Sequence, residues 1–337
     1  MISLIICSTR PHVDEKLLSN ISQTIGTEYE VIHIDNSKRQ YNIFEAYNLG
    51  VERAKGDFLC FMHEDIAYHS KNWGKAVEHH LSQKFIGAIG VAGGSVVLDR
   101  LDWRFYGFGQ VYLIQGNTTI EEHPEYYYSH KQEELKHPMT QVAILDGVWI
   151  CMRKELFNQI RFDDKNFHDF HLYDSDICMQ VNKLGLGVFV TYDVLLEHKS
   201  EGTFSEGYKE GLKVFSQKWK DDLPMVKGFI VTQEEIDEAL EKAQVHFDKR
   251  LAHDMKVIEL RKVLNMKRQG LPTRDYTEDE KKMMDGSAFL HRRLCIKDRE
   301  IPSSEVRRLI KSYHDMPFTR HTLKLCAKYF WYRILKL

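Results

Sequence analysis

The sequence lacks an apolar run as long as a membrane span, which needs about 18–20 residues, although 43% of its 337 residues are hydrophobic. It also lacks the features of a secretory signal, because residues 2–7 already have the character of a strand. Positive and negative charges nearly cancel at a formal net charge of −2, so overall charge gives no reason to expect nucleic acid as a partner. We therefore expect a cytoplasmic protein, with peripheral contact at the inner face of the membrane left open.

Two short motifs are missing as well. No CxxC pair occurs among the six cysteines, which lie far apart and mostly in apolar runs, so buried reduced thiols are favoured over disulfides or a zinc site. The first predicted strand is followed by Ser8-Thr9-Arg10. A GxGxxG turn would be needed there to admit the pyrophosphate of a dinucleotide, so an NAD-dependent Rossmann enzyme is disfavoured.

Residues 1–228 alternate short apolar strands with amphipathic helices. Near-continuous apolar strands in this order predict an α/β domain with a mostly parallel sheet flanked by helices. Residues 95–140 are irregular and rich in aromatic side chains, which is typical of a lid or binding segment. Strands are expected at 2–7, 30–36, 57–62, 85–91, 142–152 and 188–192, and helices at 16–24, 43–54, 73–83 and 177–184.

Residues 229–337 differ in character and predict a helical C-terminal extension. One long helix is expected over 232–266, with Thr232 and Glu235 as a capping box at its start. Shorter helices are expected at 277–293, 303–314 and 319–337.

The last of these helices lies in a basic stretch. Residues 303–337 contain eight Lys/Arg and two acids, and residues 319–337 interleave the basic side chains with large apolar ones. Such a helix can lie on an anionic membrane surface. It can equally dock on the protein body or on a second copy in a homodimer, and both alternatives stay open.

Polar side chains follow three successive predicted strands. The segments are Ser8-Thr9-Arg10, Asp35-Asn36 and His63-Glu64-Asp65. Because ligands of open parallel sheets bind at the carboxyl ends of the strands, we expect these segments to line one site.

Asp65 is the first candidate for chemistry. A carboxylate directly after a buried strand is suited to Mg²⁺ or Mn²⁺, which would also bind the oxygens of a diphosphate. Considered alone, such a residue more often caps a turn. Asp35-Asn36 could hydrogen-bond the base or ribose of a nucleotide or form an Asx-turn, and Arg10 could lie near phosphate or base.

Asp174 and Asp176 precede the helix expected at 177–184. Carboxylates at a helix start are favourable in themselves, but one of them could be a general base that takes a proton from an acceptor hydroxyl. His198 could be a neutral imidazole ligand of the metal, or a histidine with no such role.

The order of these motifs resembles the GT-A glycosyltransferases of family 2, and within it the group that bears a StrF-like domain. The resemblance covers roughly residues 1–220. The matching segments are 5–10 (IICSTR), 31–36 (VIHIDN), 42–57, 61–66 (FMHEDI), 145–148 (LDGV), 174–178 (DSDIC) and 198–200 (HKS).

The resemblance implies an inverting, metal-assisted transferase that moves a sugar from a nucleotide diphosphate sugar, UDP by the family's default, to a saccharide or lipid-linked acceptor. It implies a GT-A domain at 1–228. It further implies that Asp65 is the last acid of the DXD motif and Asp174 the base. The nucleotide-sugar site would comprise Thr9, Arg10, Asp35, Asn36, Glu64 and Asp146.

Two positions depart from the family's pattern. His63 replaces the first acid of DXD, so the metal would depend on Asp65 together with His198 and His63, or Glu64 would take part. Tyr173 stands where many relatives have Glu, so Asp176 could exchange roles with Asp174. These departures leave open a second hypothesis, a catalytically impaired sugar-nucleotide-binding or scaffold protein of polysaccharide assembly.

Overall fold

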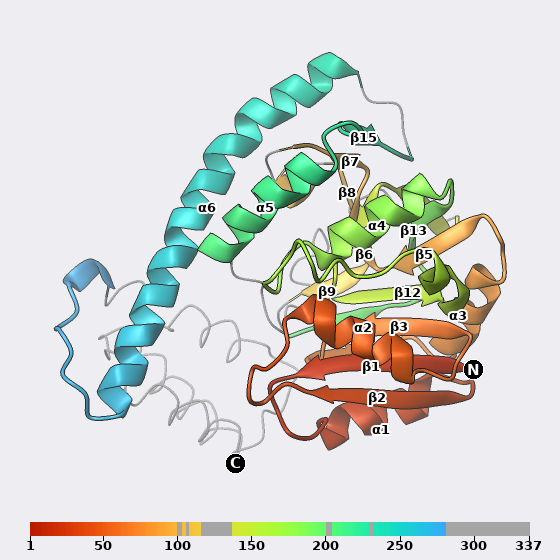
Figure 1. The fold of residues 1–337 in the computed structure, drawn as a ribbon, viewed down its shortest axis with the longest axis horizontal. Helices are drawn as coiled ribbons and strands as arrows, with labels where there is room; N and C mark the ends of the chain where they lie inside the picture. The colour runs from red at the N-terminus through yellow and green to blue at the C-terminus, as the bar shows by residue number, and fades with distance from the viewer. Residues whose placement is uncertain (100–102, 106–107, 116–136, 200–203, 229–231, 281–337) are drawn as a thin grey trace, which may run out of the picture. The chain divides into compact units, whose positions relative to one another are not determined.

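The computed structural model describes residues 1–99, 103–105, 108–115, 137–199, 204–228 and 232–280 (Figure 1). The chain divides into two compact units, Met1–Lys249 and Arg250–Leu337. This division falls within helix α6 (Gln233–Arg268), whereas the sequence places the domain boundary at residue 228, and that boundary stays a prediction. The helices predicted at 303–314 and 319–337, most of the one predicted at 277–293, and part of the aromatic segment lie outside the described residues.

The first unit is built on a seven-stranded sheet in the order β10-β13-β5-β12-β3-β1-β2. Strands β1, β2 and β3 are mutually parallel, as are β13 and β5, while β12 runs antiparallel to β3 and β5 and β10 runs antiparallel to β13. The predicted α/β class with a mostly parallel sheet is confirmed. The strands are β1 (Ile2–Ser8), β2 (Tyr29–Asp35), β3 (Phe58–Met62), β5 (Ile86–Gly90), β10 (Met139–Val142), β12 (Trp149–Arg153) and β13 (Gly187–Thr191).

The single strand predicted over 142–152 is wrong. The structure has β10, β11 (Ile144–Leu145) and β12 there, with a turn at 146–148 between the last two. The Val148 N–H donates to Asp146 Oδ1 at 3.0 Å, so the Asp side chain takes the hydrogen bond that a strand neighbour would otherwise make.

Short strands supplement this seven-stranded sheet. They form three small sheets, in the orders β11-β6-β8, β4-β14-β9 and β15-β7. Their bounds are β4 (Ile66–Tyr68), β6 (Ala92–Gly94), β7 (Val96–Val97), β8 (Gly109–Val111), β9 (Leu113–Gln115), β14 (Leu196–His198) and β15 (Met225–Val226). Three of these strands lie in the segment predicted to be an irregular lid, which is therefore partly regular.

The helices begin where local side chains satisfy their free backbone donors. Asp14 caps α1 (Glu15–Thr24), Asn42 and Glu45 form a capping box on α2 (Ile43–Arg53), and Ser205 caps α5 (Glu206–Lys218). Helix α3 (Trp73–Leu81) packs on β3, β5 and β12, and α2 packs on β1 and β2. The predicted helices at 16–24, 43–54 and 73–83 are confirmed.

Helix α4 (Tyr173–Lys183) begins four residues earlier than predicted. Leu172 precedes it with φ 66°, a left-handed conformation that is uncommon for a leucine and that the sequence does not signal. The earlier start places Asp174 and Asp176 on the first turn of the helix.

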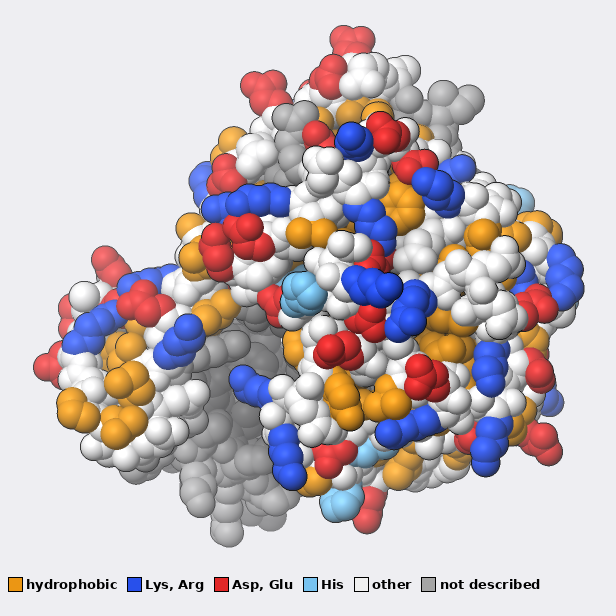
Figure 2. Space-filling model, in the orientation of Figure 1, with side chains coloured by type: hydrophobic (Ala, Val, Ile, Leu, Met, Phe, Trp, Pro, Cys, Tyr) orange, Lys and Arg blue, Asp and Glu red, His pale blue; other side chains and the backbone are white. Residues whose placement is uncertain are grey.

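Helix α6 (Gln233–Arg268) confirms the long helix predicted over 232–266. The Thr232 N–H donates to Glu235 Oε2 at 2.8 Å, and the Glu235 N–H donates to Thr232 Oγ1 at 3.2 Å, as the capping box requires. Within the described residues, no helix is long and apolar enough to cross a membrane. On the face drawn in Figure 2, basic and acidic side chains are interspersed.

Candidate active site

The carboxyl ends of β1, β2 and β3 lie side by side, because the three strands are parallel and in register. Ser8 at the end of β1 pairs with Asp35 at the end of β2, and the Asn36 N–H donates to the Ser8 carbonyl at 2.7 Å. Strand β3 ends at Met62, so segment 63–65 begins at the same edge. The structure thus brings the three predicted polar segments together.

Three potential metal ligands converge at this edge. His63 Nδ1 is 3.3 Å from His198 Nε2, which is 3.5 Å from Asp65 Oδ1. Donor atoms of the three residues all lie within 4.8 Å of one another. His198 reaches the cluster because β14 pairs with β4 and sets it opposite Ile66, and the Lys199 N–H donates to the Asp65 carbonyl at 3.0 Å.

The donor set fits a divalent ion. Two donors bound to one ion at about 2.0–2.1 Å lie about 3.0–3.4 Å apart in octahedral or tetrahedral geometry, and the two closest contacts here are near that range. Imidazole nitrogens suit transition ions, whereas Mg²⁺ prefers oxygen ligands alone. Burial, followed by the nearby charge of His198, lowers the pKa of His63 and so favours the neutral ring that binds metal.

Asp174 is joined to this cluster through its neighbours. Its Oδ2 accepts from the Gly147 N–H at 2.8 Å, and its Oδ1 accepts from the Ser175 N–H at 2.8 Å. The Gly147 carbonyl accepts from the Tyr173 hydroxyl at 3.0 Å, and that hydroxyl is 3.1 Å from His63 Nε2. One chain of hydrogen bonds therefore runs from a candidate metal ligand to the candidate base.

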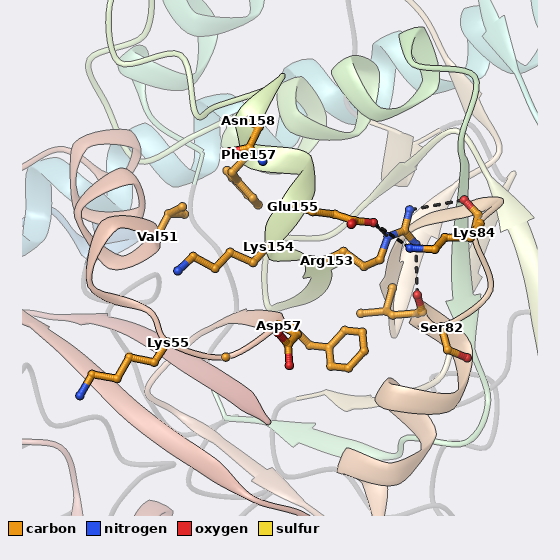
Figure 3. A pocket seen from close by; sticks show the side chains of 13 residues that line it. Val51, Lys55, Asp57, Ser82, Lys84, Arg153, Lys154, Glu155, Phe157 and Asn158 are labelled. Carbon is orange, nitrogen blue, oxygen red and sulfur yellow. Dashed lines mark hydrogen bonds and ion pairs between the residues drawn. The ribbon is translucent and has the colours of Figure 1, made fainter.

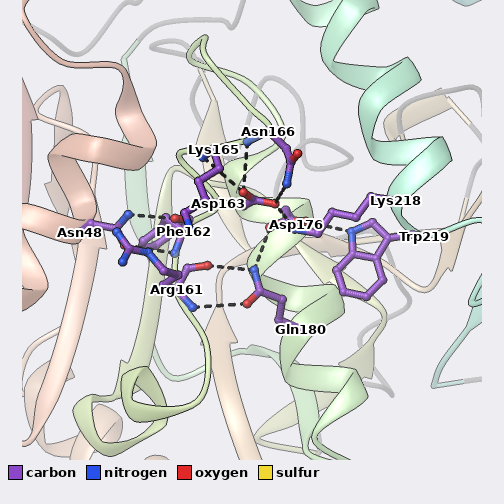
Figure 4. Close-up of polar contacts among 10 residues, drawn as sticks. All are labelled: Asn48, Arg161, Phe162, Asp163, Lys165, Asn166, Asp176, Gln180, Lys218 and Trp219. Carbon is purple, nitrogen blue, oxygen red and sulfur yellow. Dashed lines mark hydrogen bonds and ion pairs between the residues drawn. The ribbon is translucent and has the colours of Figure 1, made fainter.

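Asp176, the alternative base, lies in different surroundings (Figure 4). It is buried, its Oδ1 accepts from Trp219 Nε1 at 2.9 Å and lies 2.7 Å from Lys218 Nζ, and its Oδ2 accepts from Gln180 at 2.8 Å. Burial raises the pKa of Asp176, and Lys218 opposes that rise. The carboxylate ties α4 to the end of α5. These contacts argue against Asp176 as the base and in favour of Asp174.

Glu64 turns away from the metal cluster and toward β1. Its carboxylate accepts a hydrogen bond from Ser8 Oγ and lies 3.9 Å from Arg10 Nε. The Arg10 guanidinium is also 3.8 Å from Asp14 and is 58% exposed. Glu64 thus orients a cation that can still reach a phosphate, and Thr9 is exposed beside it.

Asp35 and Asn36 have unlike roles in the structure. Asn36 is buried, and its side-chain amide both donates to the Tyr41 carbonyl at 2.8 Å and accepts from the Tyr41 N–H at 3.0 Å. It therefore shapes the loop after β2, which argues against a direct contact with a nucleotide. Asp35 is exposed and accepts from the Ser37 N–H at 2.9 Å, which lowers its pKa, so it stays an ionised acceptor at the site.

Asp146 directly precedes Gly147, whose N–H donates to the candidate base Asp174, in the turn that ends with Val148. Its Oδ2 is 3.7 Å from an Arg104 nitrogen in the short helix η1 (Trp103–Phe105). Arg104 is a site residue that the sequence did not indicate, because nothing in its irregular segment marks it. The turn at Gly147 could have been predicted from the sequence, since an Asp-Gly pair inside an apolar stretch is typical of a turn.

Comparison with known proteins identifies the family of this chain. The model of the family described as "Glycosyltransferase like family" matches residues 3–219. The chain belongs to this family. The resemblance to glycosyltransferases inferred from the motifs is confirmed, and the narrower StrF-like group stays a prediction.

A curated relative of this glycosyltransferase-family chain is the amylovoran biosynthesis glycosyltransferase AmsB of Erwinia amylovora, 22% identical over 194 residues. The match covers 56% of this chain and 58% of the relative, so the chain matches less than two thirds of that protein's length.

Similar solved structures include a mannosyltransferase of Pyrobaculum calidifontis in complex with GDP-Man and Mn²⁺, 11% identical at a TM-score of 0.43, covering 98% of this chain and 87% of the other. Another is GalNAc-T7 with UDP, GalNAc and Mn²⁺, 13% identical at a TM-score of 0.42, covering 75% and 57%. Likeness this distant adds nothing to the family assignment.

A pocket of about 640 Å³ lies at the opposite end of β3 in this glycosyltransferase-family chain (Figure 3). Its buried cation Arg153 donates to the carbonyls of Leu81 and Ile86, and Lys154 Nζ donates to the Ala54 carbonyl at 2.5 Å. The Leu81 and Ala54 carbonyls lie at the C-terminal ends of α3 and α2, where cations are favourable, and Ile86 begins β5. The basic side chains therefore serve the protein's own backbone, and the catalytic candidates are all at the other edge.

Proposed function

We propose that this chain transfers a sugar from a nucleotide diphosphate sugar, a UDP-sugar first, to a saccharide or lipid-linked acceptor with inversion and with the help of Mn²⁺ or Mg²⁺. The observation that carries the proposal is the convergence of His63, Asp65 and His198 on one point, joined to Asp174 by hydrogen bonds. The relative named for amylovoran biosynthesis supports polysaccharide assembly as the setting.

His63, Asp65 and His198 would hold the metal, which when bound offsets the negative charge that grows on the departing diphosphate. Asp174 would accept the proton of the acceptor hydroxyl. The acceptor oxygen forms its bond to the anomeric carbon on the face opposite the diphosphate, while the bond from that carbon to the diphosphate oxygen breaks. The Gly147 N–H fixes the orientation of the base, since it donates to Asp174 Oδ2.

The ends of β1 and β2 would bind the nucleotide. Arg10 supplies a cation for phosphate or base, Asp35 supplies an ionised acceptor, and Thr9 is exposed near both. Glu64 would take part through Ser8 and Arg10. Asp146 would face the sugars, because it lies in the same turn as the amide that holds Asp174.

Turnover across a panel of UDP-, GDP- and dTDP-sugars, with Mn²⁺ and with chelator, tests the proposal. We expect donor hydrolysis with Mn²⁺ that falls at least about 100-fold with chelator or in Asp65→Asn, because the anionic metal ligand is lost. Asp57→Asn is the matched control, since Asp57 is 85% exposed near the other end of β3. Nucleotide binding without turnover of any donor would contradict the proposal and support the scaffold hypothesis.

A further inference from the structure

The Tyr173 hydroxyl lies between a metal ligand and the peptide that holds the base. It is 3.1 Å from His63 Nε2 and 3.0 Å from the Gly147 carbonyl oxygen. The side chain is buried, with its ring packed edge-on against Phe44 and Tyr47 at 6.3 and 5.3 Å between centroids. The hydroxyl is therefore held in one place from several sides.

The positions of the hydrogens follow from these contacts. A carbonyl oxygen can only accept, so the single hydrogen of the Tyr173 hydroxyl is donated to Gly147. The hydroxyl oxygen must then accept from His63, which requires the hydrogen of a neutral His63 ring to be on Nε2. The lone pair of that ring is consequently on Nδ1, the atom that faces His198 within the metal cluster.

We infer that Tyr173 is a positioning residue of the metal site, whose hydroxyl holds the His63 ring so that Nδ1 is presented to the ion. This inference rests on the proposed function. Metal-binding histidines generally donate their other N–H to an acceptor that fixes the ring and its tautomer. Tyr173 supplies that acceptor and is itself anchored on the Gly147 carbonyl.

The same hydroxyl also constrains the base. Gly147 accepts from Tyr173 through its carbonyl and donates to Asp174 through its N–H, so one residue links the two halves of the site. A Cβ at position 147 would lie 2.1 Å from the Tyr173 hydroxyl oxygen, which leaves glycine as the residue that fits. Metal ligand and base are thus placed by one network.

A double-mutant cycle on Mn²⁺ affinity tests the inference, measured on the full chain by the loss of the free-ion EPR signal. Tyr173→Phe removes only the hydroxyl and is expected to weaken Mn²⁺ binding about 10–100-fold. In a His63→Ala background the same change should alter the affinity by less than about twofold, because Tyr173 acts through His63. Tyr68→Phe, another buried tyrosine hydroxyl, is the matched control and should leave the affinity unchanged.

Two outcomes would overturn the inference while the proposed function stands: unchanged Mn²⁺ affinity in Tyr173→Phe, or an equal loss in both backgrounds, which would mark a general packing role. Failure of the unaltered chain to bind Mn²⁺, with and without UDP, would overturn the proposed function and this inference together. Thermal unfolding of each variant without metal shows whether the fold is retained. Tyr47→Phe, which removes a hydroxyl next to Tyr173, should lower the Mn²⁺ affinity less than Tyr173→Phe does.

Discussion

Asp174 and Asp176 lie two positions apart on the first turn of α4, and their surroundings differ. Asp174 is half-buried and is held by backbone N–H groups beside the metal cluster. Asp176 is buried, and Trp219, Lys218 and Gln180 contact its two oxygens. Two acids at a helix start therefore give one sequence signal but lie in two different environments. Burial and the identity of the partners, rather than the residue type, decide which acid can exchange a proton with a substrate.

Asp174→Asn gives the largest expected effect. The change keeps the shape of the side chain but removes the proton acceptor, so we expect turnover to fall about 10²–10⁴-fold. Nucleotide affinity, measured by calorimetry, should stay close to that of the unaltered chain. The free energy of unfolding should fall by less than in Asp176→Asn, because the new amide nitrogen faces a backbone donor at a half-buried position and not a buried one. Retained turnover in this variant would exclude Asp174 as the base and reopen the question for Asp176.

Asp176→Asn should affect stability instead. The variant leaves Lys218 with Asp163 alone and places an amide nitrogen against buried donors, so we expect a loss of about 2–3 kcal/mol in the free energy of unfolding. Turnover per folded molecule should change less than threefold, about 0.7 kcal/mol of barrier. A loss of turnover as large as that of Asp174→Asn, without destabilisation, would make Asp176 the base.

Asp163 shares Lys218 with Asp176, and we expect it to make a smaller, pH-dependent contribution to the free energy of unfolding. Burial alone would raise its pKa, but hydrogen bonds from Lys218 and Asn166 outweigh burial and hold the pKa below its usual value. Because the pKa of Asp163 is lower in the folded state than in the unfolded state, ionised Asp163 stabilises the fold at pH values above the unfolded-state pKa of about 3.9. This stabilisation is lost as the pH falls through the lower pKa of the folded state.

Asp163→Asn should therefore cost about 1 kcal/mol at pH 7, and the cost should shrink in urea unfolding below about pH 4. Asp221→Asn, at an exposed position, is the matched control and should show little pH dependence of its effect. A cost that stays constant from pH 7 to pH 3 would show that the ion pair contributes nothing to the stability of this region.

Hydrophobic periodicity predicts much of this fold. The buried strands β1, β3 and β5 and the helices α1, α2, α3 and α6 all follow from their apolar spacing and caps. The direction of a strand does not follow from this spacing, because an apolar run reads the same in both directions. Strand β12 is antiparallel to its two neighbours, β3 and β5. The start of α4 was missed because it depends on the left-handed Leu172, and α5 was not predicted.

The site shows the same limit. The polar segments after β1, β2 and β3 could be predicted, since parallel strands align their carboxyl ends. Contacts between distant positions could not, and the two departures from the family's pattern, His63 and Tyr173, prove to touch each other across 110 positions of the chain. Asn36 is buried and Asp35 is exposed because Asn36 hydrogen-bonds Tyr41 in the following loop, a contact that the sequence alone does not show.

The turn that contains Gly147 has a consequence for engineering this chain. Its N–H and its carbonyl belong to two successive rigid peptide planes, and a change in φ or ψ of Gly147 alters the orientation of one group relative to the other. A loop graft at 146–148, intended only to change which sugar is accepted, would also shift the partner of His63 and the donor to Asp174. Libraries that alter sugar preference should therefore keep positions 147 and 173 constant and vary Arg104, which forms an ion pair with Asp146 of the turn.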